Sequence, residues 1–337
     1  MKLIRKILAP LALLYWIITF IRNKLYDYAL FKSHSFSTPI IAVGNLSVGG
    51  TGKTPQIEYL IRLFSNKYKV AVLSRGYKRA TKGFILADEQ ATSQTIGDEP
   101  FQYYSKFKNI KVAVDANRVN GITNLLKNEN PPDLILLDDA YQHRKVKAGF
   151  YLLLTAFDDL FCDDFILPFG NLRESALGKN RANLIIVTKT PKNISETQKK
   201  EVINKLNCMQ PIFFSTIEYD ELVYNNYKSH PVSTIKEESK LVLAGIAKPS
   251  YFFDFIANST DELVTFPDHH AFSKSDCESI LMKANGKKII TTEKDYTRLK
   301  EYLPKEQLFY LPIKANFTDS NIDLILQNYV EQNTRNR

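Results

Sequence analysis

The stretch "VGNLSVGGTGKTP", from Val43 to Pro55, has the residue types and spacing of a phosphate-binding loop. Its glycines let the backbone turn several N–H groups toward one point, where Lys53 adds a cation and the Thr54 hydroxyl can ligate Mg²⁺. Ser47 replaces the first glycine of the usual pattern, but the glycines nearest the phosphates remain. We therefore predict a nucleotide-binding loop that consists of Gly49, Gly50, Thr51, Gly52, Lys53 and Thr54.

Two adjacent acids, Asp138 and Asp139, follow the apolar run "LILL" downstream of this loop. A metal-holding acid is expected beside a phosphate-binding loop, although adjacent acids are also common at the solvated end of a strand. Because Asp138 and Asp139 follow four apolar residues downstream of a phosphate-binding loop, the sequence favours a role for these acids in holding a metal ion. His143 follows on the expected exit loop, near the phosphates, and the later motif "NLRES" adds Arg173 and Glu174.

Three further motifs contain candidates for catalysis or binding. Asp98 in "IGDEP" could take a proton from an attacking hydroxyl, although Asp-Glu-Pro is also an ordinary helix start. Arg75 in "SRGYKR" follows an expected strand, at the sheet edge where ligands bind in α/β folds. "FPDHHAF" groups Asp268, His269 and His270; a histidine beside an aspartate is usually structural, but this pair could also orient or assist a base.

The elements that must position these motifs are indicated by short apolar runs that lack polar alternation. Runs such as "PIIAVGN", "KVAVLS", "LILLDD" and "NLIIVTK" are typical of strands buried on both faces of a parallel sheet, with helix-like segments between them. The fold class is therefore α/β. A polar stretch at 218–240 is the expected linker. We predict a phosphate-loop core at 33–217 and a smaller α/β domain at 241–337.

Composition narrows the classes of protein that are possible. The chain has 337 residues, of which 44% are hydrophobic and 24% charged, as in a folded globular protein. Its three cysteines, Cys162, Cys208 and Cys277, lie far apart, which argues against a disulfide scaffold, and no group of residues has zinc spacing. The net charge of +9 favours acidic partners, such as nucleic acid, an anionic membrane surface or phosphorylated substrates.

The first 32 residues favour the membrane surface among these partners. Fifteen uncharged residues lie between Lys6 and Arg22, whereas a spanning helix needs about 20 apolar residues. A signal peptide is disfavoured, because basic residues follow directly and no small-residue cleavage site is present. A helix embedded in one leaflet is the favoured interpretation, with an ordinary core helix as the alternative. The basic residues on both flanks suit anionic lipid, namely Lys2, Arg5, Lys6, Arg22 and Lys24.

The motifs together resemble a known family, the tetraacyldisaccharide 4′-kinases, which are the lipid A 4′-kinases of Gram-negative bacteria. The matching pieces, in order, are "VGNLSVGGTGKTP", "LSRGYKR", "GDEP", "LDDAYQHR", "FGNLRE", "GIAKPSYF", "FPDHHAF" and "TTEKD". They extend from Val43 to Asp295, after a similar N-terminal membrane helix. The loop "AGIAKPSYF" differs from the version with glycine and asparagine that the family pattern leads us to expect.

The resemblance implies ATP-dependent phosphorylation of the 4′-hydroxyl of a tetraacyl glucosamine disaccharide 1-phosphate, at the cytoplasmic face of the inner membrane. It further implies two α/β domains with the site in the cleft between them. Asp98 would be the base, supported by His269 and Asp268. Lys53 and Thr54 would bind phosphates and Mg²⁺. The other implied site residues are Asp138, Asp139 and Glu174 near the metal, and Asn45, Arg75, Arg118 and His143 for the sugar and its 1-phosphate.

Two other functions remain as alternatives from the sequence alone. A switch protein could use nucleotide hydrolysis to drive partner binding, but partitioning ATPases have a lysine where this chain has Val48. A GTPase would read guanine with an aspartate at the place of Pro191 in "TKTP". A nucleic-acid enzyme is motivated only by net charge, since no aromatic-basic motif is present. We expect neither a nucleic-acid partner nor an obligate protein partner.

Overall fold

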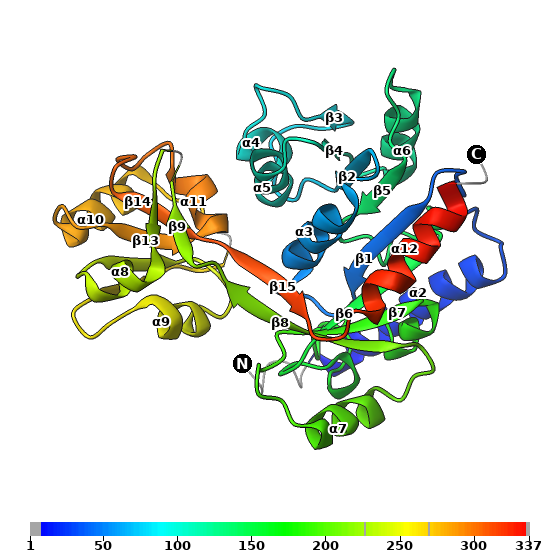
Figure 1. Cartoon of the computed structure of the whole chain (residues 1–337). Helices are drawn as coiled ribbons and strands as arrows, with labels where there is room; N and C mark the ends of the chain where they lie inside the picture. Colours follow the sequence, from blue (N-terminus) through cyan, green and yellow to red (C-terminus); the bar gives the residue numbers. More distant parts are fainter. Residues whose placement is uncertain (1–7, 226, 269, 335–337) are drawn as a thin grey trace.

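The computed structural model describes residues 8–225, 227–268 and 270–334, and it contains two β-sheets (Figure 1). The larger sheet has nine strands in the order β15-β8-β7-β6-β1-β5-β2-β4-β3. Neighbours from β8 to β4 are all parallel, and β15 and β3 pair antiparallel at the two edges. The strands are β1 (Ile40–Asn45), β2 (Val70–Ser74), β3 (Ile85–Leu86), β4 (Lys111–Val114), β5 (Leu134–Leu137), β6 (Phe150–Ala156), β7 (Leu184–Thr188), β8 (Ile212–Tyr219) and β15 (Ile313–Phe317).

The central parallel strands β7, β6, β1, β5 and β2 are buried on both faces, as their continuous apolar runs predicted. Ile41 and Val43 of β1 contribute to the core on one face, and Ile40 and Ala42 contribute to the core on the other. Between the strands the chain forms helices α3 (Lys53–Phe64), α4 (Ser93–Ile96), α5 (Asp98–Lys106), α6 (Arg118–Lys127) and α7 (Glu196–Leu206), with 3₁₀ turns η1 (Phe161–Asp163) and η2 (Ala176–Arg181).

The smaller sheet has six strands in the order β10-β9-β14-β13-β11-β12 and its own apolar core on each face. Its strands are β9 (Leu222–Tyr224), β10 (Ser229–Pro231), β11 (Leu241–Ala244), β12 (Glu262–Thr265), β13 (Ile289–Thr292) and β14 (Leu308–Leu311). The accompanying helices are α8 (Val232–Glu237), α9 (Ser250–Ile256), α10 (Lys274–Ala284) and α11 (Glu293–Leu299). The predicted α/β class with a second, smaller α/β unit is confirmed.

The ranges of the two units differ from the expected ones. The stretch 218–240 is not only a linker, because it supplies β9, β10 and α8 to the smaller unit. The range 241–337 is not one unit either. After β14 the chain returns along β15, which pairs with β8, and helix α12 (Asn321–Thr334) then packs on the larger core (Figure 1). The two antiparallel strands β8 and β15 therefore connect the units.

Helix α2 (Ala9–Asp27) lies on the surface of the larger unit, with Thr19 as its one buried residue. This placement excludes the alternative of an ordinary core helix. Seven aliphatic or aromatic side chains of α2 between Leu11 and Ile21 are each at least 39% exposed, in addition to Trp16 at 38%. No helix in the described part of the chain is long and apolar enough to cross a membrane. The predicted basic residues Lys2, Arg5 and Lys6 lie outside the described residues.

Candidate active site

The predicted phosphate-binding loop connects β1 to α3, in the strand–loop–helix setting that the motif requires. Gly49 and Gly52 have φ values of 116° and 81°, which a side chain would strain. The loop is braced from β7, since the Thr188 hydroxyl donates to the Thr51 carbonyl at 2.8 Å. Lys189 Nζ donates to the Gly50 carbonyl at 2.5 Å. The Thr51 hydroxyl is buried without a hydrogen-bond partner among the described residues, so the loop offers it to a ligand.

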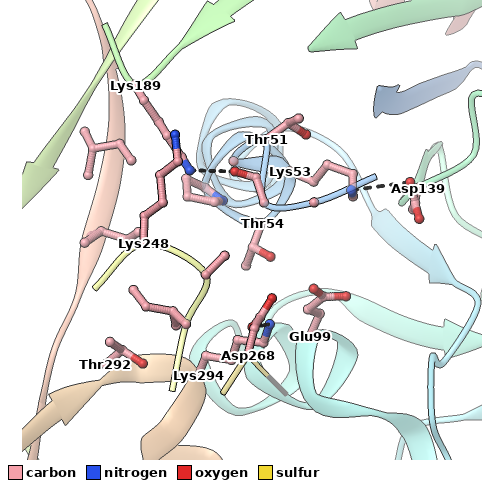
Figure 2. Close-up of a pocket in the computed structure, with 18 of the residues that line it drawn as sticks. Thr51, Lys53, Thr54, Glu99, Asp139, Lys189, Lys248, Asp268, Thr292 and Lys294 are labelled. Carbon is pink, nitrogen blue, oxygen red and sulfur yellow. Dashed lines mark hydrogen bonds and ion pairs between the residues drawn. The ribbon is translucent and has the colours of Figure 1, made fainter. Parts of the chain in front are cut away.

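Lys53, at the start of α3, faces the acid pair that follows β5. Its Nζ lies 3.5 Å from Asp139 Oδ1 and 3.4 Å from Asn45 Oδ1 (Figure 2). Burial alone would raise the pKa of Asp139, but the charges of Lys53 and Arg173 hold it below its ordinary value. Arg173 Nη1 lies 3.1 Å from both Asp139 oxygens. Asp139 is therefore an ionised carboxylate at the edge of the phosphate-binding loop.

Asp138 is in a different environment from its neighbour. Its side chain is buried, and burial, followed by the charges of Glu99 and Asp139, raises its pKa to about 7. The Ser74 hydroxyl donates to Asp138 Oδ2 at 3.2 Å. A buried carboxylate with a raised pKa gains most from a cation placed beside it. The two acids thus provide one half-buried and one fully buried carboxylate next to the loop.

The phosphate-binding loop and Asp139 line one large cavity of 1230 Å³, to which both units contribute. The larger unit contributes the loop from Val48 to Pro55 together with Asp139, and the smaller unit contributes Lys248, Asp268 and Lys294 (Figure 2). Helix α2 also contributes Tyr15 and Arg22 to the wall. The cavity continues along the two connecting strands to an apolar region lined by Ile217, Tyr219, Ile246, Phe252, Phe255, Leu311 and Ile313.

Two of the four predicted substrate residues line this cavity, and two do not. Arg75 and His143 belong to the wall. Burial, followed by the charges of Arg118 and Arg75, lowers the pKa of His143 to about 4, so its ring is neutral near pH 7. Asn45 is fully buried and donates to the Ser47 carbonyl at 2.7 Å.

Arg118 is buried as well, and it holds the backbone behind the acid pair. Its Nη2 donates to the Asp138 carbonyl at 3.1 Å, and its Nη1 donates to the Asp115 carbonyl. Burial lowers the pKa of its guanidinium to about 10, which leaves it charged. Neither Asn45 nor Arg118 lines the cavity. The arrangement therefore favours a supporting role for these two side chains over direct contact with substrate.

Glu174 is the third acid that was expected near the metal. The side chain is buried and does not line the cavity. Its Oε1 accepts from Gln142 Nε2 at 3.0 Å and from Arg181 Nη2 at 2.8 Å, and its Oε2 accepts from Asn23 Nδ2 at 2.6 Å. Because three donors already occupy its oxygens, Glu174 ties α2 to the loop of Arg173 rather than facing the nucleotide site.

The predicted base, Asp98, is the first residue of α5. It contacts the smaller unit, since Arg298 Nε and Nη2 donate to Asp98 Oδ2 at 2.8 and 2.5 Å. Its neighbour Glu99 lines the cavity. Asp268 lies in the same wall, 3.3 Å from Lys294 Nζ. His269, the predicted supporter of the base, lies outside the described residues.

Several wall residues were not predicted. Lys189 directly follows β7, within the motif "TKTP", and the side chain of Lys248 extends toward it from the smaller unit (Figure 2). Burial and the charge of Lys248 lower the pKa of Lys189. Arg22 was predicted only as a basic flank of the membrane helix. The sequence signal that could have identified Lys189 as a site residue is its position directly after an apolar strand.

Comparison with known proteins identifies the family of this chain. A family model described as tetraacyldisaccharide-1-phosphate 4′-kinase matches residues 4–331. The chain belongs to this family. The tetraacyldisaccharide 4′-kinase of Flavobacterium johnsoniae is 60% identical over 337 residues, which cover 99% of each chain. That of Bacteroides thetaiotaomicron is 42% identical over 361 residues, which cover 99% of this chain and 95% of that one.

The fold is that of a solved tetraacyldisaccharide 4′-kinase. The crystal structure of LpxK from Aquifex aeolicus in complex with ATP matches with a TM-score of 0.80 and 28% identity, over 97% of this chain and 99% of that chain. The predicted family, the predicted kinase class and the predicted fold are confirmed.

Proposed function

We propose that this chain transfers the γ-phosphate of ATP to the 4′-hydroxyl of a tetraacyldisaccharide 1-phosphate, in lipid A biosynthesis. The observation that carries this proposal is that one cavity is lined both by the phosphate-binding loop and by α2, the helix with the exposed apolar face. A nucleotide phosphate and a membrane-embedded acceptor can therefore reach the same space. Membership of the 4′-kinase family supports the choice of acceptor.

The residues at the loop fit Mg²⁺. The donor set is made of hard oxygens: the Thr54 hydroxyl, the ionised Asp139 and the buried Asp138. Mg²⁺ is usually bound through one or two carboxylates together with substrate phosphates, so a larger cluster of protein ligands is not required. Held by these residues, Mg²⁺ would neutralise negative charge on the phosphates during transfer. We do not include Glu174 among the ligands, because its oxygens are occupied.

The chain's own residues then have separable tasks. The loop N–H groups and the helix α3 dipole bind the phosphates, and Lys53 neutralises charge on the transferred group. Asp98 takes the proton of the 4′-hydroxyl, with Asp268 and His269 as its expected support. Arg75 and the neutral His143 bind the sugar and its phosphate from the cavity wall, while Asn45 and Arg118 hold the backbone behind them.

A direct assay tests this function. Purified protein, ATP labelled on the γ-phosphate and Mg²⁺ are incubated with a disaccharide 1-phosphate lipid, with no-lipid and Lys53→Ala samples as controls. We expect label in the lipid fraction only with lipid and intact Lys53. Lipid-independent ATP hydrolysis without labelled lipid would instead favour the switch-protein alternative.

We further propose that α2 holds the enzyme in the cytoplasmic leaflet of the inner membrane without crossing it. The exposed apolar side chains of α2 would enter the acyl region, while Lys24 meets anionic headgroups. The opposite face of α2 is tied to the catalytic loops, since Tyr15 donates to the Arg173 carbonyl at 2.9 Å and Asn23 donates to Glu174. The cavity would then open beside the lipid surface.

A further inference from the structure

The exposed face of α2 ends in basic and aromatic side chains. Ile17, Ile21, Lys24 and the C-cap residue Tyr28 are spaced three or four residues apart, so they lie along one side of the helix. Lys24 Nζ lies 5.8 Å from the ring centroid of Phe20 and 5.9 Å from that of Tyr28. Tyr28 is 72% exposed. This end of the face therefore has the composition that is typical of a membrane–water interface.

A second basic segment lies beside the chain that leaves α2. It belongs to the loop that follows the acid pair. The His34 N–H donates to the Lys145 carbonyl at 2.8 Å, and the Lys147 N–H donates to the His34 carbonyl at 2.9 Å. The Ser33 hydroxyl donates to the Arg144 carbonyl at 2.7 Å. These hydrogen bonds hold the loop and the segment after α2 side by side.

The two segments bring together an excess of positive charge. Residues 24–34 and 143–148 contain five lysines and arginines but a single carboxylate, that of Asp27. Asp27 Oδ1 lies 2.8 Å from Arg144 Nη2, so its charge is matched by the one arginine of the group. The four lysines of the two segments are all exposed, and we call them the basic surface: Lys24, Lys32, Lys145 and Lys147.

An anionic bilayer fits this surface better than an acidic protein does. Lysines beside anionic headgroups gain from Coulomb attraction, and their stems can lie along apolar groups while the ammonium groups stay in water. The basic surface is also continuous with the apolar face of α2. Leu30 and Tyr28, which are 70% and 72% exposed, stand between Lys24 and Lys32 in the sequence. An acidic protein would match the charge of the lysines but not these apolar side chains.

We propose that the basic surface binds anionic phospholipid headgroups, which makes the loop after the acid pair a second membrane-contacting element besides α2. This proposal rests on the placement of α2 in the proposed function. The loop also contains His143, which lines the cavity two residues before Lys145. Contact of the loop with headgroups therefore holds this wall of the cavity beside the lipid surface.

Vesicle binding by the double variant Lys145→Gln/Lys147→Gln tests the proposal. The full chain is sedimented with vesicles of phosphatidylcholine, with or without added phosphatidylglycerol, in the absence of nucleotide. On the anionic vesicles we expect the affinity to fall by about fivefold per lysine, or about 25-fold for both, from the usual contribution of a basic residue near such a surface. On phosphatidylcholine alone the affinity should be unchanged. The difference from wild type should shrink as salt is added.

Lys274→Gln/Lys287→Gln is the matched control, because it changes the net charge equally at two exposed lysines of the smaller unit. It should leave binding to anionic vesicles unchanged. An equal loss from both double variants would overturn the proposal, since net charge alone would then explain the binding. Wild-type binding of Lys145→Gln/Lys147→Gln to anionic vesicles would overturn it as well, and would leave the basic surface to an acidic protein. Thermal unfolding of each variant confirms that it is folded.

Failure of the proposed function gives a different result. Leu14→Asp/Ile18→Asp in the apolar face of α2 should weaken binding to both kinds of vesicle. If this variant bound both as wild type does, the placement of α2 would be wrong, and the proposal that rests on it would be overturned. Vesicle binding needs no turnover. A protein that bound anionic vesicles through Lys145 and Lys147 but did not phosphorylate lipid would support the basic surface and contradict the kinase activity.

Discussion

The Lys53 ammonium group lies 3.5 Å from the Asp139 carboxylate, across the space between the phosphate-binding loop and the strand that ends beside it. Lys53 is 14% exposed and Asp139 is 34% exposed, so the pair is partly screened from water. Asp139 also pairs with Arg173. Because Asp139 has this second cation, Lys53 can pair with a nucleotide phosphate as well as with Asp139. An incoming nucleotide would thus find a cation already placed and oriented.

Lys53→Ala should abolish phosphoryl transfer, because the lysine neutralises charge on the transferred group and such interactions contribute several kcal/mol to the transition state. The assay is transfer of labelled phosphate at saturating ATP. Ser47→Gly is the matched control and should be nearly neutral. Ser47 contributes its carbonyl to Asn45, which a glycine retains. Near-wild-type activity of Lys53→Ala would contradict the assignment of the loop.

Much of the fold could be predicted from the sequence because its signals are local. Continuous apolar runs indicated the parallel strands, and the glycines with Lys53 indicated the loop. The return of the chain to the larger sheet was not predicted. Leu308 to Lys314 looks like one strand, yet Pro312 separates β14 from β15 and the two strands join different sheets. Strand β15 is half-exposed, and its sequence has no pattern that indicates which sheet it joins.

The candidate site was predictable only where its residues stand in compact motifs. Arg298 contacts Asp98 across 200 positions of sequence, and Asn23 contacts Glu174 across 151. Such contacts depend on how distant parts of the chain pack together, and no local sequence pattern predicts that packing. The three hydrogen bonds of Glu174 were not predictable for the same reason, since the sequence does not distinguish a carboxylate that binds a cation from one that accepts three hydrogen bonds.

Glu174→Gln should lower stability without changing the requirement for Mg²⁺. The carboxylate accepts three hydrogen bonds in a buried site, and bonds to charged groups contribute about 1.5–3 kcal/mol each. We expect a lower free energy of unfolding in urea and an unchanged Mg²⁺ concentration for half-maximal activity. Asp139→Asn is the comparison, and it should raise that concentration. If Glu174→Gln raised it to a similar extent, a direct metal role for Glu174 would be restored.

Glu293 predicts a pH dependence of stability at the interface of the two units. Burial, followed by the charge of Glu58, raises its pKa from 4.5 to about 7, although Lys106 opposes the shift. A raised pKa means that the folded state binds the proton more tightly than the unfolded state does. The stability that Glu293 contributes is therefore present below about pH 4.5 and is lost as the pH rises to about 7.

The comparison of wild type with Glu293→Gln isolates this contribution, because the amide resembles the protonated acid. Across pH 4.5 to 7, the unfolding temperature of the wild type should fall relative to that of the variant. The measurement is thermal unfolding of both proteins in the same buffers. If the unfolding temperature of the wild type instead rose relative to that of the variant, the ion pair with Lys106 would have a larger effect on the pKa of Glu293 than burial and the charge of Glu58 together.

The exposed face of α2 should be required for the membrane and dispensable for the fold. Fifteen uncharged residues span about 22 Å as a helix, against a hydrocarbon core of about 30 Å, and basic residues on both flanks would cost a few kcal/mol each to bury. The helix is therefore expected to lie in one leaflet. Leu14→Asp and Ile18→Asp change side chains that are 54% and 56% exposed, without touching the face that contacts Arg173 and Glu174.

These two variants should release the protein from anionic vesicles and reduce phosphorylation of a long-chain lipid more than that of a soluble short-chain analogue, because only the long-chain substrate must be met at a bilayer. Met282→Asp is the matched control, since Met282 is 79% exposed on α10 of the smaller unit. It should leave vesicle binding unchanged. Equal losses on both substrates would place the effect of α2 in the cavity instead, through Tyr15 and Arg22. An N-terminus that resists protease added on the cytoplasmic side, but is cut by protease added on the periplasmic side, would contradict the single-leaflet arrangement. A helix that stays in the cytoplasmic leaflet keeps its N-terminus on the cytoplasmic side.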